Sequence, residues 1–320
     1  MGLTAYVALQ QWCETTDAPR RALEAAGFTV QRNLLGRRLR PDEMPELLRD
    51  ADAVLAGVEP YDAALLRRLP RLRCISRCGA GTDAIDVEAA RQLGIAVFTT
   101  PDEVIEPVAQ LTVAMMLGLA RNLGLHQADF RAGRWQKQTG ALLSEWTIGL
   151  VGFGRIGQAV HGYLKPFRPR LLVVDPAYRA EQMPEGVELR DLSELLAASD
   201  VVSLHASRPP EAGPLIGRKE LAVMKRGSRL VNTARGYLVD DAALFGALTS
   251  GHLAGAALDV FEHEPYAGPL ARLPQVLCTP HVATLTRASR VAMELRCAQQ
   301  VVSSFASQSA ADRPVEARSR

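Results

Sequence analysis

The run at 147–164, TIGLVGFGRIGQAVHGYL, restricts the fold of this chain more than any other segment. The segment begins with five mostly apolar residues, TIGLV. The glycine motif GFGRIG, from Gly152 to Gly157, comes next, and a helix-forming stretch follows it. A strand that passes through three spaced glycines into a helix is typical of a β-α-β unit. The first glycine permits the tight turn, the second lets a ligand approach the backbone, and the third lets helix and strand pack closely. The segment therefore predicts a parallel sheet with an anion site at the helix N-terminus.

The same alternation of strands and helices extends over most of the chain, which indicates two parallel sheets. Strands are expected at 3–9, 28–30, 53–56, 72–76 and 95–98, and then at 147–151, 171–174, 201–204, 229–232, 255–258 and 276–278. Helices are expected at 18–26, 41–49, 61–69, 87–93, 106–122, 158–164 and 287–305. The last helix has no place in the second sheet, so we expect it to return to the first. A length of 320 residues also favours two domains over one core.

Composition argues against several kinds of partner. The net charge is +2, and the arginine clusters at 37–40 and 67–68 lack interleaved aromatic residues, so no nucleic-acid partner is predicted. The longest apolar stretch, 108–120, is too short to span a bilayer, and the N-terminus does not resemble a signal peptide. The five cysteines have no C-x-x-C or zinc spacing, which predicts free thiols, no metal site and a cytoplasmic location.

The strand after the glycine segment ends in an acid. LLVVD places Asp175 close to the spacing of about 20 residues expected for a ribose-binding carboxylate. Such a carboxylate accepts hydrogen bonds from an adenosine ribose and repels a 2′-phosphate. The pattern therefore favours NAD over NADP, with NADP left open because Arg179 is near.

Three ionisable residues follow later strands. Arg235 comes after RLVNTA, Glu264 lies in DVFEHEP, and His281 comes after VLCTP. A guanidinium at a strand end can hold a carboxylate with two parallel hydrogen bonds. An imidazole, with an unperturbed pKa of about 6.5, can deliver a proton to a developing alkoxide, and a carboxylate can orient it. Alone, Arg235 fits a salt bridge and His281 a structural role. Together the three indicate redox chemistry on a small acidic carbonyl compound.

With these residues in place, the chain resembles the D-isomer-specific 2-hydroxyacid dehydrogenases, among them the phosphoglycerate dehydrogenase-like members, over nearly its whole length. The shared segments are SRCGAGTDAIDVEAA, TPDEVIEPVAQLTVAMMLGLAR, GFGRIG, LVNTARGYLVD, GAALDVFEHEP and TPHVATLT. The resemblance implies an α/β fold in which a Rossmann NAD-binding domain, 101–285, is inserted in a flavodoxin-like substrate-binding (catalytic) domain formed by 1–100 and 286–320. It also implies an active site in the cleft between the domains and a homodimer formed through the cofactor domain.

The resemblance assigns roles to individual residues. Arg235 would bind the substrate carboxylate and carbonyl, His281 would be the general acid/base, and Glu264 would be its partner. Asp259 would hold the nicotinamide carboxamide. The implied cofactor-binding set is Gly152, Gly154, Arg155, Ile156, Gly157, Asp175, His205, Thr233, Ala234 and Asp259. The implied substrate loop is Arg77, Cys78, Gly79, Ala80 and Gly81, which would present N–H groups to the substrate carboxylate.

The implied reaction is hydride transfer between nicotinamide C4 and C2 of a small D-2-hydroxyacid or 2-oxoacid. The turn at 56–60 reads AGVEP, without the arginine that phosphoglycerate-type members tend to carry there. Glu59 in this turn disfavours a phosphate, so we expect a substrate like glyoxylate or hydroxypyruvate, with 3-phosphoglycerate kept open. An NAD(H)-sensing corepressor is the alternative from another functional class. It is disfavoured because the long partner-binding extensions of such proteins are not seen.

Overall fold

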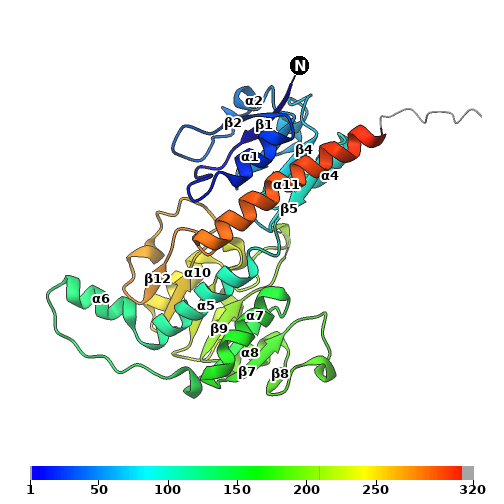
Figure 1. Cartoon of the computed structure of the whole chain (residues 1–320). Coiled ribbons are helices and arrows are strands. Elements are labelled where there is room, and N and C mark those ends of the chain that lie inside the picture. Colours follow the sequence, from blue (N-terminus) through cyan, green and yellow to red (C-terminus); the bar gives the residue numbers. More distant parts are fainter. Residues whose placement is uncertain (1, 209, 312–320) are drawn as a thin grey trace, which may run out of the picture. The chain divides into compact units, whose positions relative to one another are not determined.

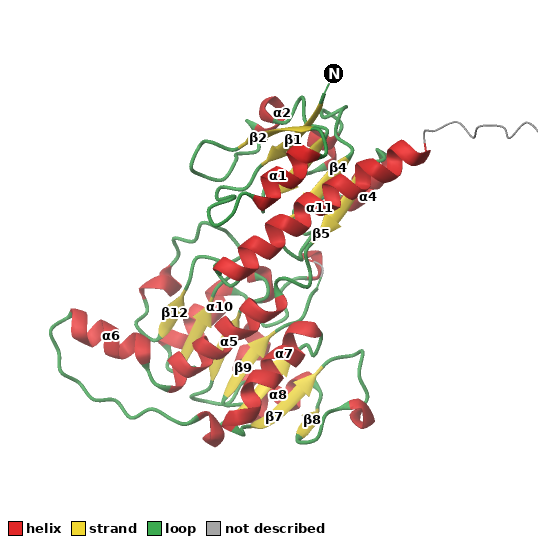
Figure 2. Ribbon diagram, in the orientation of Figure 1, coloured by secondary structure: helices red, strands yellow, loops and turns green. Residues whose placement is uncertain are grey.

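The computed structural model describes residues 2–208 and 210–311. The chain forms two compact units, which are Met1–Val104 with Thr284–Arg320 (unit 1) and Ile105–Ala283 (unit 2). Each unit consists of one parallel sheet with helices packed against it (Figures 1 and 2). The two parallel-sheet domains expected from the sequence are therefore present.

The sheet of unit 1 has five parallel strands in the order β2-β1-β3-β4-β5. The strands are β1 (Leu3–Val7), β2 (Phe28–Arg32), β3 (Ala53–Ala56), β4 (Cys74–Arg77) and β5 (Ala96–Thr99). This is the flavodoxin-like order. All four residues of the central strand β3 are buried, as expected for a parallel strand covered on both faces.

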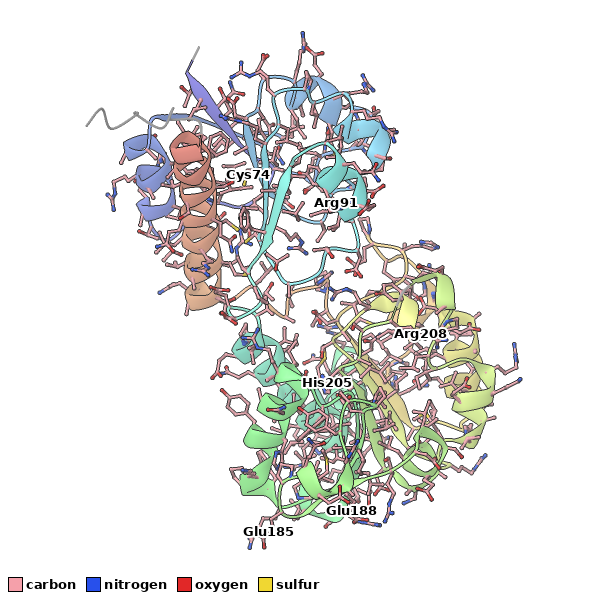
Figure 3. The ribbon with its side chains drawn as sticks, turned by 90° about the vertical axis from the view of Figure 1, so that its right-hand side faces the viewer. Cys74, Arg91, Glu185, Glu188, His205 and Arg208 are labelled. Atoms are coloured by element: carbon pink, nitrogen blue, oxygen red, sulfur yellow. The ribbon has the colours of Figure 1, made fainter. Side chains whose placement is uncertain are left out.

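The helices of unit 1 cover the two faces of this sheet. They are α1 (Ala18–Ala25), α2 (Met44–Leu47), α3 (Ala63–Leu66), α4 (Val87–Gln92) and α11 (Arg287–Ala311). Helices α1 and α11 pack together on one face, and α3 and α4 pack together on the other (Figures 1 and 3). Gln300 fixes α11 to the sheet, because it donates to the Thr99 carbonyl at 2.8 Å and accepts from Ser76 Oγ at 2.7 Å. The last helix thus returns to the first unit, as predicted.

The sheet of unit 2 has seven parallel strands in the order β12-β11-β10-β9-β6-β7-β8. They are β6 (Thr147–Val151), β7 (Arg170–Val174), β8 (Val187–Leu189), β9 (Val201–Leu204), β10 (Arg229–Asn232), β11 (Gly255–Leu258) and β12 (Val276–Cys278). Strand β6 pairs with both β7 and β9, so the strand order reverses at β6. Open α/β sheets bind ligands at the carboxyl ends of the strands at such a switch point. The arrangement confirms the Rossmann-type fold.

Successive residues of the central strands of unit 2 pack into two different cores. Val202 belongs to the core with α8 (Leu192–Ala198), α9 (Arg218–Val223) and α10 (Asp241–Thr249). Val201 belongs to the core with α5 (Ile105–Ala120) and α7 (Arg155–Leu164). Neighbouring side chains of a strand point to opposite faces, so both faces of this sheet are apolar. This explains why the strands read as continuous apolar runs.

The structure differs from the predicted elements at several places, and helix α3, for example, has four residues where 61–69 was predicted. The helix predicted at 106–122 ends at Ala120, because Asn122 has a left-handed backbone (φ 50°) and α6 (Leu123–Arg131) begins directly after it. The edge strand β8 was not predicted, since three residues are too few for a periodic pattern. Helix α2 is shorter than predicted, because Glu43 binds the Arg40 N–H at 2.8 Å and 40–43 form a turn.

No single helix in the described ranges is both long and apolar enough to cross a membrane. Helices α5 and α6 reach that length and composition only as a pair bent by 63°. Most of α5 is buried within unit 2.

Candidate active site

The glycine segment forms the turn between β6 and α7. Gly152 has a φ of +97°, and a Cβ there would lie 2.7 Å from the backbone of His205 and Ala206. A side chain at this position would therefore force the neighbouring strand end away. Gly154 precedes the first residue of α7, and the space around its Cβ position is open to at least 4 Å. The N–H groups at the start of α7 can therefore be approached by an anion.

Around this turn, Arg155 is exposed, Ile156 is half-buried and Gly157 is buried. Asp175 lies directly after β7, beside the turn. Its Oδ2 accepts the Phe153 N–H at 2.7 Å and its Oδ1 accepts the Ala177 N–H at 2.9 Å. The carboxylate therefore holds the glycine turn in shape as well as lying next to it. Each carboxylate oxygen has a further lone pair that can accept from a ribose hydroxyl.

Two more predicted cofactor residues follow strands β9 and β10. His205 lies directly after β9 (Figure 3), with Nε2 2.9 Å from Ser203 Oγ. Burial lowers the pKa of His205 to about 4, so its ring is neutral at pH 7. Thr233 is buried, and its hydroxyl lies 2.8 Å from that of Thr112 on α5. The Thr233 hydroxyl is therefore hydrogen-bonded within unit 2.

His281 and Glu264 form a hydrogen-bonded pair. Nδ1 of His281 lies 2.9 Å from Oε2 of Glu264, and Oε1 of Glu264 accepts the Phe261 N–H at 3.1 Å. The side chain of His281 is 39% exposed, so a ligand can reach the ring. The carboxylate is therefore held by the backbone while it holds the imidazole. This geometry suits a proton donor whose orientation is fixed by its partner.

The turn that carries His281 is held by Asp259, a support that the sequence analysis missed. Asp259 is fully buried, and its carboxylate accepts bonds from Thr279 Oγ1 at 2.6 Å, the Val282 N–H at 2.8 Å and the Ala283 N–H at 3.0 Å. His281 itself has a left-handed backbone (φ 55°), which is uncommon for a residue other than glycine. The bonds to Asp259 stabilise that conformation. The only sequence signal was the position of Asp259 at the end of the strand beside β12.

Arg235 lies in the turn after β10, and the Asn232 side chain fixes that turn. Asn232 Nδ2 donates to the Arg235 carbonyl at 2.8 Å, and its Oδ1 accepts the Ala234 N–H at 3.0 Å. A Cβ at Gly236 would lie 1.9 Å from the Phe261 carbonyl carbon, so only glycine lets this turn contact the segment before Glu264.

Strand β11 pairs with both β10 and β12. The turns that bear Arg235, Glu264 and His281 therefore follow neighbouring strands at one sheet edge.

The predicted substrate loop lies in unit 1, after β4. The Cys78 N–H donates to the Ala56 carbonyl at 2.9 Å, and the Gly79 N–H donates to Thr100 Oγ1 at 2.7 Å. The Arg77 guanidinium donates to the Cys78 carbonyl. Ala80 is exposed and Gly81 is half-buried. The N–H groups of Cys78 and Gly79 are thus used inside unit 1, and those of Ala80 and Gly81 are the candidates for a ligand.

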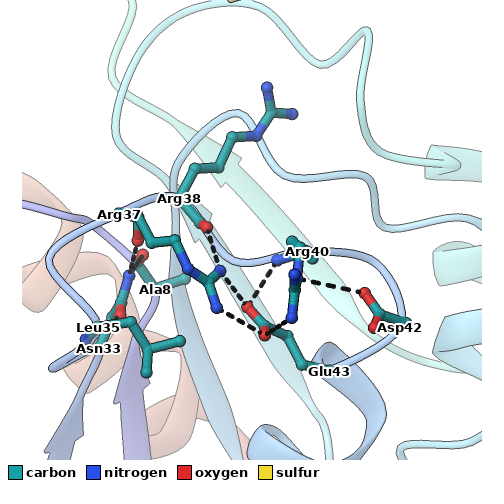
Figure 4. Close-up of polar contacts among 8 residues, drawn as sticks. All are labelled: Ala8, Asn33, Leu35, Arg37, Arg38, Arg40, Asp42 and Glu43. Atoms are coloured by element: carbon teal, nitrogen blue, oxygen red, sulfur yellow. Dashed lines mark hydrogen bonds and ion pairs between the residues drawn. The ribbon is translucent and has the colours of Figure 1, made fainter.

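A base reaches the turn at 56–60, although the sequence of that turn contains none. Arg38 donates to the Val58 carbonyl from the loop between β2 and α2. Its neighbours Arg37 and Arg40 bind Glu43 instead, whereas the Arg38 guanidinium extends away from Glu43 (Figure 4). The hydrogen bonds from Arg37 hold the pKa of Glu43 at about 2.

Glu59, in the same turn, is only 3% exposed, and its Oε2 accepts the Gly57 N–H at 2.9 Å. Burial raises the pKa of this carboxyl. The turn therefore holds a buried acid and is contacted by an exposed base from another loop.

The chain matches the family model described as D-isomer specific 2-hydroxyacid dehydrogenase, NAD binding domain, over residues 113–283. It is 38% identical over 270 residues to a D-3-phosphoglycerate dehydrogenase of Methanocaldococcus jannaschii, which covers 82% of this chain and 51% of that protein. It is 37% identical over 269 residues to a glyoxylate reductase of Thermococcus litoralis, which covers 80% of this chain and 81% of that one. The crystal structure of a glyoxylate reductase from Paecilomyes thermophila matches with a TM-score of 0.83 at 30% identity over 95% of each chain. The chain thus spans about half the length of the phosphoglycerate dehydrogenase and most of the glyoxylate reductases.

Proposed function

Since the chain belongs to the D-isomer specific 2-hydroxyacid dehydrogenase family, we propose that it is an NAD-dependent oxidoreductase acting on a small D-2-hydroxyacid or 2-oxoacid. The observation that carries the proposal is the His281–Glu264 pair. The pair lies at the carboxyl edge of the seven-stranded sheet. Strand β6, at which the strand order of this sheet reverses, leads into GFGRIG at the same edge. A proton donor and a dinucleotide turn at one sheet edge are what a hydride transfer to a carbonyl requires.

The residues at the β6–α7 turn fit a dinucleotide. The ten-residue helix α7 offers its N-terminus to a pyrophosphate, and the open space at Gly154 lets the group approach. Asp175 favours NAD, because its carboxylate would bind ribose hydroxyls and repel a 2′-phosphate. When bound, NAD(H) would supply or accept the hydride.

The side chains of this chain would supply the proton and hold the substrate. In reduction, protonated His281 would give its proton to the carbonyl oxygen, while Glu264 at Nδ1 keeps the ring oriented. Arg235 would bind the substrate carboxylate with two hydrogen bonds, helped by the N–H groups of Ala80 and Gly81. Positioning and the fixed positive charge would account for most of the barrier reduction.

The proposed substrate is a 2-oxoacid like glyoxylate or hydroxypyruvate. This is supported by the buried Glu59 and by the similarity to glyoxylate reductases. A 3-phosphorylated substrate is the alternative, because the exposed Arg38 reaches the turn that holds Glu59. Arg38→Ala distinguishes the two. It should raise KM only for a phosphorylated substrate, and Arg37→Ala, which breaks the Glu43 pair instead, should leave every KM unchanged.

We further propose that unit 2 forms a homodimer through α6 and the segment that follows it. Four large apolar side chains are exposed there, Leu123 (55%), Phe130 (64%), Trp135 (77%) and Leu142 (60%). The rings of Phe130 and Trp135 pack edge to face with centroids 5.5 Å apart. Apolar residues gathered on one exposed segment are typical of an interface between subunits.

A steady-state assay tests the proposed activity. NADH oxidation would be followed with glyoxylate, hydroxypyruvate and 3-phosphohydroxypyruvate, for the wild type, His281→Ala and His252→Gln. Loss of a general acid typically costs about 10²- to 10⁴-fold, so His281→Ala should lower kcat by that factor and leave NADH affinity unchanged. His252 bonds to the Leu221 carbonyl, so its substitution should leave kcat unaltered. The absence of turnover with every substrate, or an unchanged kcat in His281→Ala, would reject the proposal.

A further inference from the structure

Two charged side chains on α11, Arg290 and Glu294, connect this helix to two loops of unit 1. They lie one helical turn apart, with Nη2 of Arg290 2.7 Å from Oε1 of Glu294. Arg290 also donates from Nη2 to the Gln11 carbonyl at 2.7 Å and from Nη1 to the free thiol of Cys78 at 3.5 Å. Glu294 accepts the Cys13 N–H at 2.9 Å through Oε2. The pair therefore holds two separate loops to one helix.

The two loops leave the same edge of the five-stranded sheet. One, at 8–17, follows β1, and the other, which begins at Cys78, follows β4. Strands β1 and β4 are parallel, and each is hydrogen-bonded to β3, which lies between them. Their carboxyl ends therefore point the same way, and α11 packs against β4 (Figure 1). The second loop is the one proposed to bind the substrate carboxylate through the N–H groups of Ala80 and Gly81.

The Arg290–Glu294 pair is better suited to fixing positions than to adding stability. The two side chains are only 19% and 6% exposed. At such a site the cost of removing two charges from water offsets much of their attraction, so apolar residues often replace a buried pair without loss of stability. A guanidinium, however, presents its donors in a rigid plane, which sets the directions of all the groups that it binds. Here those groups are Glu294, the backbone of the loop at 8–17 and the first side chain of the substrate loop.

We propose that Arg290, oriented by Glu294, is a positioning residue that holds the substrate loop in place for the 2-oxoacid. The N–H groups of Cys78 and Gly79 bond to acceptors at the ends of β3 and β5. Arg290 binds the thiol of Cys78 from α11. The start of the loop is thus fixed both from the sheet and from the helix. These contacts set the place at which the next two residues, 80–81, present their N–H groups.

Loss of Arg290 should affect the 2-oxoacid and spare the cofactor. The proposed NAD-binding residues all lie in unit 2, whereas this loop lies in unit 1. A misplacement of about 1 Å in a positioning group can cost about 100-fold in rate. We therefore expect Arg290→Met to lower kcat/KM for the 2-oxoacid by about 10- to 100-fold and to leave NADH affinity unchanged. This effect on activity rests on the proposed function, because it requires the loop to bind substrate, whereas the effect on the loop itself does not.

Hydrogen-exchange mass spectrometry of the full chain without ligand tests the hold on the loop independently of activity. Peptides that contain residues 78–79 should exchange about 10-fold faster in Arg290→Met than in the wild type, because a hydrogen bond from a charged group is lost. Arg71→Met is the matched control. Arg71 pairs with Asp52 at 2.7 Å, and Asp52 accepts the Thr4 N–H at 2.8 Å, but this pair lies at the amino end of β3 in the same sheet. The control should leave exchange at 78–79 and kcat/KM unchanged. Equal exchange of these peptides in the wild type and Arg290→Met would overturn the proposal.

A double variant separates positioning from stability. Arg290→Met alone leaves the Glu294 carboxylate buried without its cation, which is destabilising. Adding Glu294→Gln removes that charge and keeps an oxygen for the Cys13 N–H, so urea unfolding should show recovered stability. The bond to Cys78 is absent from both variants, so kcat/KM should stay about 10- to 100-fold low in each. Recovery of kcat/KM together with stability would show a purely structural role and overturn the proposal. Failure of the proposed function would appear differently, as absence of turnover in the wild type while exchange at 78–79 still responds to Arg290→Met.

Discussion

Nδ1 of His281 lies 2.9 Å from Oε2 of Glu264, and the two residues approach each other from different turns at the sheet edge. Each partner is held by a separate set of bonds, Glu264 by the Phe261 N–H and the His281 turn by Asp259. The position of the pair is therefore set by hydrogen bonds within the chain itself.

Replacing Glu264 by glutamine should lower kcat while the hydrogen bond to the ring is kept. The amide oxygen can still accept from the imidazole, but the negative charge that stabilises the imidazolium is lost. Hydrogen bonds to charged groups contribute about 1–2 kcal/mol more than neutral ones, which corresponds to about a 5- to 30-fold drop. Steady-state kinetics measures it, with the nearby Glu262→Gln as control. An equal kcat in wild type and Glu264→Gln would remove Glu264 from the mechanism.

Replacing Asp175 by serine should shift the preference from NADH towards NADPH. The substitution removes the charge that opposes a 2′-phosphate, while the hydroxyl can accept one of the two backbone bonds. The measurement is the ratio of kcat/KM for the two cofactors. Asp191→Asn is the control, because Asp191 caps α8 and asparagine is an equivalent cap, so the substitution removes a carboxylate elsewhere without changing the ratio. A ratio that does not change in Asp175→Ser contradicts the ribose-binding role.

His205 should make the fold less stable in acid. Its pKa is about 4 in the folded chain, below the ordinary 6.5, so the unfolded chain binds the proton first. The stability it contributes is therefore complete above pH 6.5 and is lost as the pH falls from 6.5 towards 4, by at most about 3 kcal/mol.

Urea unfolding at pH 7 and pH 4.5 checks this. His205→Asn should lose less stability between these two values than the wild type does, whereas His126→Asn, on α6, should lose as much as the wild type. Equal losses in all three proteins would show that His205 does not carry the effect.

Serine at both Phe130 and Trp135 should weaken self-association. The two substitutions remove the most exposed aromatic side chains of the proposed interface. Analytical ultracentrifugation over a concentration series should show a dimer for the wild type and a shift to monomer for the double variant. Leu34→Ser is the control, since Leu34 is 77% exposed but lies in unit 1. A monomeric wild type would contradict the proposed dimer.

The sequence was sufficient to predict both sheets, because their central strands are buried on two faces and therefore appear as apolar runs between helices. It was also sufficient for the placement of Arg235 and His281 in the turns that follow β10 and β12. Other features depend on contacts between distant segments. The support of the His281 turn by Asp259 and the reach of Arg38 to Val58 have no local pattern. The break at Asn122 depends on one left-handed residue inside an otherwise helical stretch.

The return of α11 to unit 1 has a consequence for biosynthesis. Unit 2 is one continuous segment, so it can complete its sheet as soon as residue 283 has left the ribosome. Unit 1 contains the first residues to be made, yet the helix that covers β4 and supplies Gln300 is made last. Unit 1 is therefore the later of the two units to finish folding, and until then the part of its sheet that α11 covers is exposed to chaperones and proteases.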